Sequence, residues 1–247
     1  MASTTDPDVS CSTRTPSALT CTICNLPAKD CARCRSAAYC SPTCQNLDWP
    51  LHKTLCKKFT ATPPRPSLAH KLGILFPPDS TSPKLVWVNF VKTKFTEIEG
   101  LFDVPNVSEF LTYGPSDRFD PEQLLIEPQR IMREQNIDHT LAVYMRDNFG
   151  ADGSKMTQSA SSITGGKMTH DWKGPLVILS MEGQSIPRTR ELKIEGMTVL
   201  RTSAGLAFQG SMDVTLKDLR IVLDYFLAYP YELERGLHLR DLNGNRL

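Results

Sequence analysis

The feature that most limits how this chain can fold is a dense group of cysteines near its N-terminus. Seven of the eight cysteines and one histidine fall within 36 residues, with the spacing C-x2-C-x6-C-x2-C-x5-C-x3-C-x7-H-x3-C. A unit of this length is too short to fold on an apolar core alone. In a reducing compartment, cysteines at this density favour metal binding over disulfides. The candidate ligands are Cys21, Cys24, Cys31, Cys34, Cys40, Cys44, His52 and Cys56.

Zinc is the metal that suits this set of ligands. It prefers thiolate and imidazole donors and takes four of them in closed structural sites. Eight such ligands fill two tetrahedral sites and leave no position for a reacting water molecule. We therefore expect two Zn²⁺ ions with a structural role, each contributing about 10–16 kcal/mol to folding.

The last four candidate ligands form two pairs, and the members of each pair are four residues apart. This spacing places two side chains on one face of a helix. Ser41 followed by Pro42 is typical of a helix N-cap and first helical position, and Pro50 repeats the pattern. We expect two short consecutive helices that need the metal for their stability.

This array resembles the MYND-type zinc finger over residues 21–56, including Tyr39 before the fifth cysteine and the ending CQ…DW…H…C. The spacer NLPAKD between the first two cysteine pairs is shorter than in many members and contains no ligand. The resemblance implies an interleaved arrangement, in which the first and third pairs of ligands share one ion and the second and fourth pairs share the other. A sequential arrangement, with the first four cysteines on one ion, is the alternative.

The resemblance also implies a partner. MYND fingers bind short proline-containing peptides of a Pro-x-Leu-x-Pro kind, and Gln45 and Trp49 match positions that line the peptide groove. Trp49 would pack on apolar side chains of the peptide, and Gln45 would hydrogen-bond its backbone. The alternative is that Trp49 fills the space between the two expected helices.

Nucleic acid is a less favoured partner. Residues 21–58 carry six basic and two acidic side chains, a net charge of +4, while the whole chain has a net charge of +1. No helix presents a run of base-contacting side chains. Direct nucleic-acid binding is therefore not expected.

Composition divides the chain into four parts. The expected parts are a disordered polar tail at 1–20, the finger at 21–58, a semi-rigid linker with six prolines at 59–83, and an α+β domain at 84–247.

Several elements are expected in the last part. Residues rich in β-branched and aromatic side chains predict strands at 84–93, 140–147 and 174–181, with one or two more within 191–208. Short helical turns are expected at 119–135, and a long mobile loop at 150–166, which is rich in Gly, Ser and Thr. A capping box of Thr215 and Asp218 predicts the start of an amphipathic helix, VTLKDLRIVLDYFLAY.

No catalytic motif is complete. SSITGGKM lacks the first glycine and the Ser/Thr of a phosphate-binding loop. His139 and His170 each lie beside an aspartate only by adjacency in sequence, which does not indicate a catalytic His-Asp pair. SET-domain lysine methyltransferases also carry MYND fingers, and they bind the methyl donor through an Asn-His motif. This chain has no Asn-His dipeptide. Segments HDWKGPLVIL and DVTLKDLRIVLDYF resemble uncharacterised C-terminal regions of fungal MYND proteins, which have no known activity.

We therefore expect a non-enzymatic zinc-binding adaptor that acts in the cytoplasm or nucleus. Its finger would bind proline-containing peptides, in transcriptional regulation or ubiquitin-linked complexes. No apolar run is long enough to span a membrane, so no membrane partner is expected. The alternative is an enzyme or ligand-binding activity in residues 84–247.

Overall fold

The computed structural model describes residues 19–94, 100–111, 121–126, 138–146, 152–168, 170–187, 190–194, 197–201 and 206–235. Nearly all of the expected disordered tail, residues 1–18, lies outside the described residues.

The N-terminal region folds as a small hairpin followed by a helix. Strands β1 (Lys29–Asp30) and β2 (Ala38–Tyr39) pair antiparallel, and helix α1 spans Pro42–Ala61. Ser41 is the N-cap, with its hydroxyl oxygen 3.3 Å from the backbone nitrogen of Cys44, which donates.

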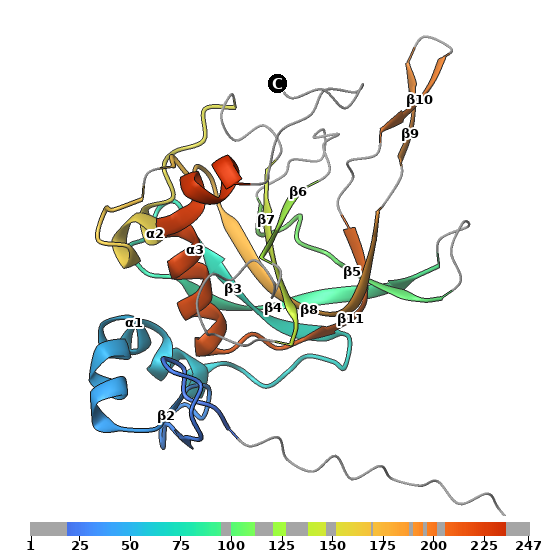
Figure 1. Cartoon of the computed structure of the whole chain (residues 1–247). Helices are drawn as coiled ribbons and strands as arrows, with labels where there is room; N and C mark the ends of the chain where they lie inside the picture. Colours follow the sequence, from blue (N-terminus) through green and yellow to red (C-terminus); the bar gives the residue numbers. More distant parts are fainter. Residues whose placement is uncertain are drawn as a thin grey trace, which may run out of the picture.

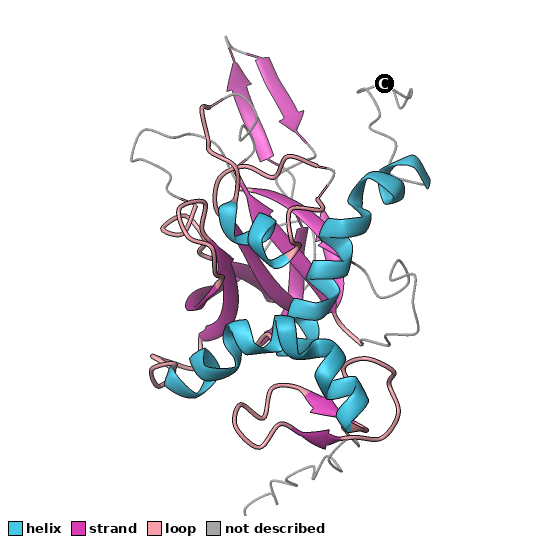
Figure 2. Cartoon of the chain, turned by 90° about the vertical axis from the view of Figure 1, so that its left-hand side faces the viewer, coloured by secondary structure: helices cyan, strands magenta, loops and turns pink. Residues whose placement is uncertain are grey.

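The expectation of two short helices is wrong, because α1 continues through Pro50. Proline lacks the N–H that would bond the carbonyl of Asn46 and usually bends a helix, and the helix ribbon bends in its middle (Figure 2). Leu51 and Leu55 are buried in the second half of the helix, so tertiary packing holds the turns beyond the proline.

The rest of the chain is built around an antiparallel sheet. Its strands are β3 (His70–Phe76), β4 (Lys84–Thr93), β5 (Phe102–Pro105), β6 (Glu122–Ile126), β7 (Thr140–Met145), β8 (Leu176–Pro187) and β11 (Leu206–Met212). Their order is β11-β5-β4-β3-β8-β7-β6, and β11 also pairs with β8. The sheet therefore curls until five strands, β8, β3, β4, β5 and β11, form a closed ring. A separate hairpin, β9 (Arg190–Ile194) and β10 (Met197–Arg201), projects from it (Figure 1).

The central strands bury both of their faces. Along β8, Leu176 and Ile178 belong to one apolar cluster, whereas Val177, Leu179 and Met181 belong to a second. This alternation explains why the segment PLVIL is apolar at nearly every position. The helices cover one side of the sheet (Figure 2), and the second cluster fills the other side.

Helix α3 (Leu216–Arg235) packs against both the sheet and the finger. The predicted capping box is present: the backbone nitrogen of Thr215 donates to Asp218 Oδ2 at 2.7 Å, and the backbone nitrogen of Asp218 lies 3.3 Å from Thr215 Oγ1. The predicted apolar stripe is buried at Leu216, Leu219, Val222, Leu223 and Phe226.

The range expected as a linker, 59–83, contains the central strand β3 instead. Between the prolines of this range lies a proline-free stretch, HKLGILF, in which Leu72, Ile74 and Phe76 are buried on one face. Gly73 faces the other side, where a Cβ would lie 2.8 Å from Leu179 Cδ2. Proline density therefore marks the two ends of a strand here, and not a spacer.

Two other expectations also need correction. Part of 119–135, expected as helical turns, is strand β6, which pairs with β7, while 127–135 lies outside the described residues. The expected loop 150–166 contains helix α2 (Gln158–Ile163), and Ser159 donates to the carbonyl of Pro77 at 2.8 Å. The fold is dominated by its sheet, so the expected α+β class describes it only roughly.

The finger packs directly on the sheet and α3 (Figure 1). Tyr39, Leu51 and Leu55 belong to the same apolar cluster as the buried stripe of α3. The backbone nitrogen of Leu216 lies 3.0 Å from both the carbonyl and the hydroxyl oxygen of Ser36. The finger and the sheet thus share one core.

Candidate metal centres

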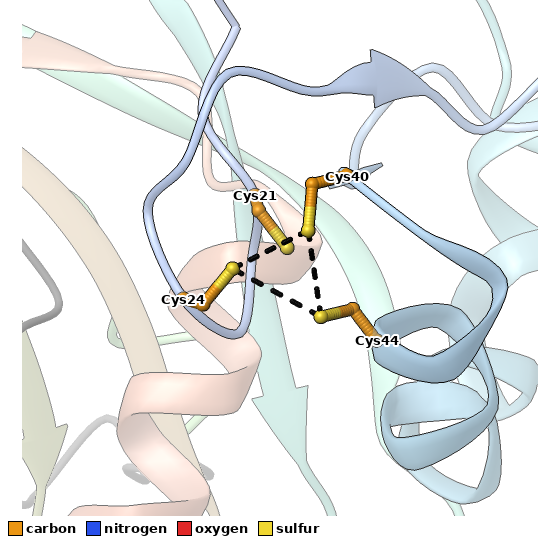
Figure 3. A group of neighbouring side chains, drawn as sticks. All are labelled: Cys21, Cys24, Cys40 and Cys44. Atoms are coloured by element: carbon orange, nitrogen blue, oxygen red, sulfur yellow. Dashed lines mark hydrogen bonds between the residues drawn. The ribbon is translucent and has the colours of Figure 1, made fainter.

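The first group of candidate ligands consists of four cysteines from three local elements. Cys21 and Cys24 come from one tight turn, Cys40 follows β2, and Cys44 lies in the first turn of α1 (Figure 3). Three sulfur–sulfur distances are 3.4 Å (Cys24–Cys40), 3.6 Å (Cys40–Cys44) and 3.9 Å (Cys24–Cys44). A tetrahedral zinc with Zn–S bonds of about 2.3 Å separates its sulfurs by about 3.8 Å. The group therefore fits a zinc site with four thiolate ligands.

The second group consists of Cys31, Cys34, His52 and Cys56, whose donor atoms all lie within 4.8 Å of one another. Cys34 Sγ is 3.5 Å from His52 Nε2, and a tetrahedral zinc separates a sulfur from a ring nitrogen by about 3.6 Å. His52 and Cys56 come from one face of α1, beyond its bend. The group fits a zinc site with three thiolate ligands and one imidazole, and the division into two groups is the interleaved one, not the sequential one.

Disulfides do not account for this clustering. All seven described cysteines are free thiols, and their sulfurs lie well beyond the disulfide bond length of about 2.05 Å. The residues fit two Zn²⁺ ions held by four donors each, with no donor position left over.

The two cysteine turns share a backbone conformation. Asn25 and Arg35, each directly after a Cys-x2-Cys pair, have φ values of 58° and 52°. Each donates its backbone N–H to the carbonyl of the first cysteine of its pair, at 3.0 Å and 2.9 Å. These left-handed residues close the turns that bring both sulfurs to one point.

Backbone hydrogen bonds lower the pKa of one of these thiols, whereas burial and neighbouring sulfurs raise the pKa of two others. Burial raises the pKa of Cys21, but backbone N–H groups, chiefly that of Cys40, outweigh it and lower the pKa to about 6. Contacts with the sulfurs of Cys24 and Cys44 raise the pKa of Cys40 to about 12. Burial, and then the charges of Cys34 and Cys31, raise the pKa of Cys56 to about 12. A bound cation is what would allow all these sulfurs to be thiolates together.

The two candidate peptide-binding residues lie on α1, one turn apart. Gln45 is exposed and Trp49 keeps 45% of its surface exposed. The Trp49 ring packs on His52, with ring centroids 5.6 Å apart and tilted by 60°. Trp49 therefore covers a metal-site residue with one side and faces solvent with the other.

The structure also shows residues near the sites that the sequence did not single out for a role. Tyr39 and Asp48 are buried beside His52, and Lys217 of α3 donates to Asn25 Oδ1 at 3.0 Å. The role of Asp48 could have been inferred from the sequence, because it is an acidic residue inside a metal-binding helix. The contact of Lys217 could not, because it depends on tertiary packing.

Among the described residues, no helix is both long and apolar enough to cross a lipid bilayer.

Comparison with known proteins agrees with this geometry. Residues 10–56 match the family model of the MYND finger. No curated protein and no solved structure matches the chain. The match ends at Cys56, the last residue of the second ligand group, and it covers both groups. The chain therefore carries a MYND-type zinc finger with ligand groups for two zinc ions.

Proposed function

We propose that this protein is a non-enzymatic zinc-binding adaptor whose MYND finger binds proline-containing peptides of partner proteins. MYND fingers are generally protein-interaction modules, and the two zinc groups have no vacant ligand position for chemistry. The cytoplasm or nucleus suits seven unpaired thiols. Regulatory complexes, including transcriptional ones, are the proposed setting.

The observation that carries the proposal is the partly exposed ring of Trp49. A large aromatic side chain with 45% exposure, held on one side by the buried His52, offers a rigid apolar surface. Such surfaces suit proline-rich peptides, which bind with little loss of conformational entropy. Exposed Gln45, one helical turn away, offers an amide that can both donate to and accept from a peptide backbone.

Charge supports a protein partner over nucleic acid. In residues 21–58, six basic and two acidic side chains, seven thiolates and two doubly charged ions leave a net charge of +1. One of the basic side chains, Lys58, is engaged in hydrogen bonds to Ser82 and to the carbonyl of Pro83, both at 2.6 Å. Little positive charge remains for phosphate contacts.

The test is the affinity of the full-length, zinc-loaded protein for a fluorescent Pro-x-Leu-x-Pro peptide. Trp49→Ala should weaken binding by about 2 kcal/mol or more, which is roughly thirtyfold in Kd. Leu47→Ala is the matched control, because Leu47 is an exposed apolar residue, 63% exposed, near Trp49 on the same helix.

Elemental analysis must find the same zinc content in both variants, since Trp49 contacts His52. Gln45→Ala, which leaves that contact intact, should also weaken binding. Equal affinities of wild type, Trp49→Ala and Gln45→Ala for the peptide would contradict the proposal.

A further inference from the structure

Three buried polar groups form a chain that ends at the second metal group. The hydroxyl oxygen of Tyr39 lies 2.5 Å from His52 Nδ1 and 2.6 Å from Asp48 Oδ2. The exposed fractions of His52, Asp48 and Tyr39 are 0%, 1% and 8%. The rings of Tyr39 and His52 also stack, with centroids 5.6 Å apart and planes at 22°.

Counting protons along this chain fixes the state of the histidine. The phenol of Tyr39 has one proton and two short contacts, so it can donate to only one of its neighbours. If it donates to the carboxylate of Asp48, the Nδ1 of His52 must carry the proton and donate to the phenol oxygen. Nε2 is then the nitrogen with a free electron pair, and it is the atom that lies 3.5 Å from Cys34 Sγ.

The reverse direction is incompatible with metal binding. If Tyr39 donated to His52 Nδ1, the neutral ring would carry its proton on Nε2, which could not then coordinate zinc. Nε2 is free to coordinate zinc only if His52 Nδ1–H donates to the Tyr39 oxygen and the Tyr39 hydroxyl donates to Asp48. The chain of hydrogen bonds then ends on a carboxylate, which accepts.

We propose that Tyr39 and Asp48 are positioning residues of the zinc site that contains His52. They fix the tautomer and the ring orientation of His52 and make its Nε2 a stronger donor to the metal. The inference rests on the two zinc sites described above and is independent of peptide binding. The four-cysteine group contains no histidine, so this chain of hydrogen bonds serves one site and leaves the other as an internal reference.

The first test measures zinc release from the full-length, zinc-loaded protein in competition with a chelator of known affinity. Tyr39→Phe removes only the hydroxyl and should lower the affinity of one of the two zinc ions by about 10–100-fold. The other ion should keep its affinity. Tyr144→Phe is the control, because Tyr144 is a buried tyrosine in the sheet whose hydroxyl accepts from Gln123 Nε2 at 2.9 Å.

Asp48 offers a graded version of the same test. Asp48→Asn keeps an oxygen that can accept from Tyr39 but loses the charge, whereas Asp48→Leu removes the acceptor and keeps the number and branching of the side-chain heavy atoms. The affinity of the His52-containing site for zinc should therefore fall more in Asp48→Leu than in Asp48→Asn. Unchanged affinities for both ions in Tyr39→Phe and Asp48→Leu would overturn the proposal, even if the variants melted at lower temperature.

A second measurement needs no variant and remains decisive if the substitutions prevent folding. Proton–nitrogen correlation spectra of the histidine rings in the zinc-loaded wild type should show His52 protonated at Nδ1 and coordinated through Nε2. A ring protonated at Nε2, or coordinated through Nδ1, would overturn the proposal.

Discussion

The finger and the sheet reach their folds by different means, although they share a core. The finger is organised by eight ligands within 36 consecutive residues. The sheet is organised by contacts between distant segments, such as the pairing of Ile74 in β3 with Ile178 in β8. A local pattern can specify the first region almost alone, whereas the second depends on burial that only the complete chain provides.

Their contact joins the two mechanisms. Leu55 of α1 and Leu219 of α3 lie in one apolar cluster, and Ser36 of the finger accepts from the first residue of α3. Metal binding should therefore stabilise the sheet as well as the finger, which separate domains would not do.

The largest expected effect is that of metal removal. Stripping both zinc ions removes about 10–16 kcal/mol per site from the folded finger, and it should also lower the melting temperature of the sheet. Calorimetry of the full-length protein with and without chelator, with zinc counted by elemental analysis, measures this. A melting transition of the sheet that stays unchanged after chelation would show that the finger and sheet are energetically separate.

Leu55→Ala tests the shared core directly. Leu55 is fully buried in the finger, and truncation of such a leucine costs about 2–5 kcal/mol. In zinc-saturated protein, that loss should appear in the unfolding curve followed by tryptophan fluorescence, to which Trp172, buried against α3, contributes. Leu47→Ala, at an exposed position of the same helix, should leave the free energy of unfolding nearly unchanged.

Gly73→Ala probes the sheet alone. The new Cβ would lie 2.8 Å from Leu179 Cδ2 and 3.1 Å from the carbonyl oxygen of Ile178, and such overpacking costs about 1–3 kcal/mol. Urea unfolding measures the loss. Gly210→Ala should cost less, because its nearest neighbour is the flexible end of Glu182 at 3.3 Å; equal losses in the two variants would contradict the close packing at β3.

The smallest effect concerns pH and the start of α3. His139 Nε2 donates to Asp218 Oδ1 at 2.8 Å, and its Nδ1 lies 3.1 Å from Asp138 Oδ1. Burial alone would lower the pKa of His139, but the hydrogen bonds and charges of Asp218 and then Asp138 outweigh it and raise the pKa. The imidazolium therefore stabilises the fold fully below the unfolded-state pKa of about 6.5 and loses this effect as pH rises through the higher folded-state value.

The measurement is the difference in unfolding free energy between wild type and His139→Gln across this pH range. The destabilisation by the substitution should shrink as pH rises, and should stay below that of Leu55→Ala throughout. The difference also cancels the loss of zinc at low pH, which both proteins share. A difference that does not change with pH would contradict a raised pKa.

The sequence predicted the finger better than the sheet for a physical reason. Ligand spacing is local, and eight donors at the right separations determine two tetrahedra with little help from the rest of the chain. The continuation of α1 through Pro50 was missed because it depends on the packing of Leu51 and Leu55 against distant α3.

In the rest of the chain, the expected strand at 84–93 is present, and so is the helix that follows Thr215. A concentration of β-branched and aromatic residues and a capping box are strong local signals. Strand β3 was missed since prolines on both sides suggested a linker, although every second residue from Leu72 to Phe76 is buried. Helix α2 was missed because it is short and rich in small hydroxyl side chains, and its order depends on contacts with distant segments, such as the bond of Ser159 to Pro77.

The position of β3 has a practical consequence for work with fragments. This strand follows the finger directly in sequence yet sits between β4 and β8 in space. Composition suggests a domain boundary near residue 84. A truncated protein that begins there would lack β3, which would open the five-stranded ring and leave Leu176 and Ile178 of β8 without their paired residues in β3. Such a fragment should aggregate, so expression trials should keep the finger and the whole sheet on one polypeptide.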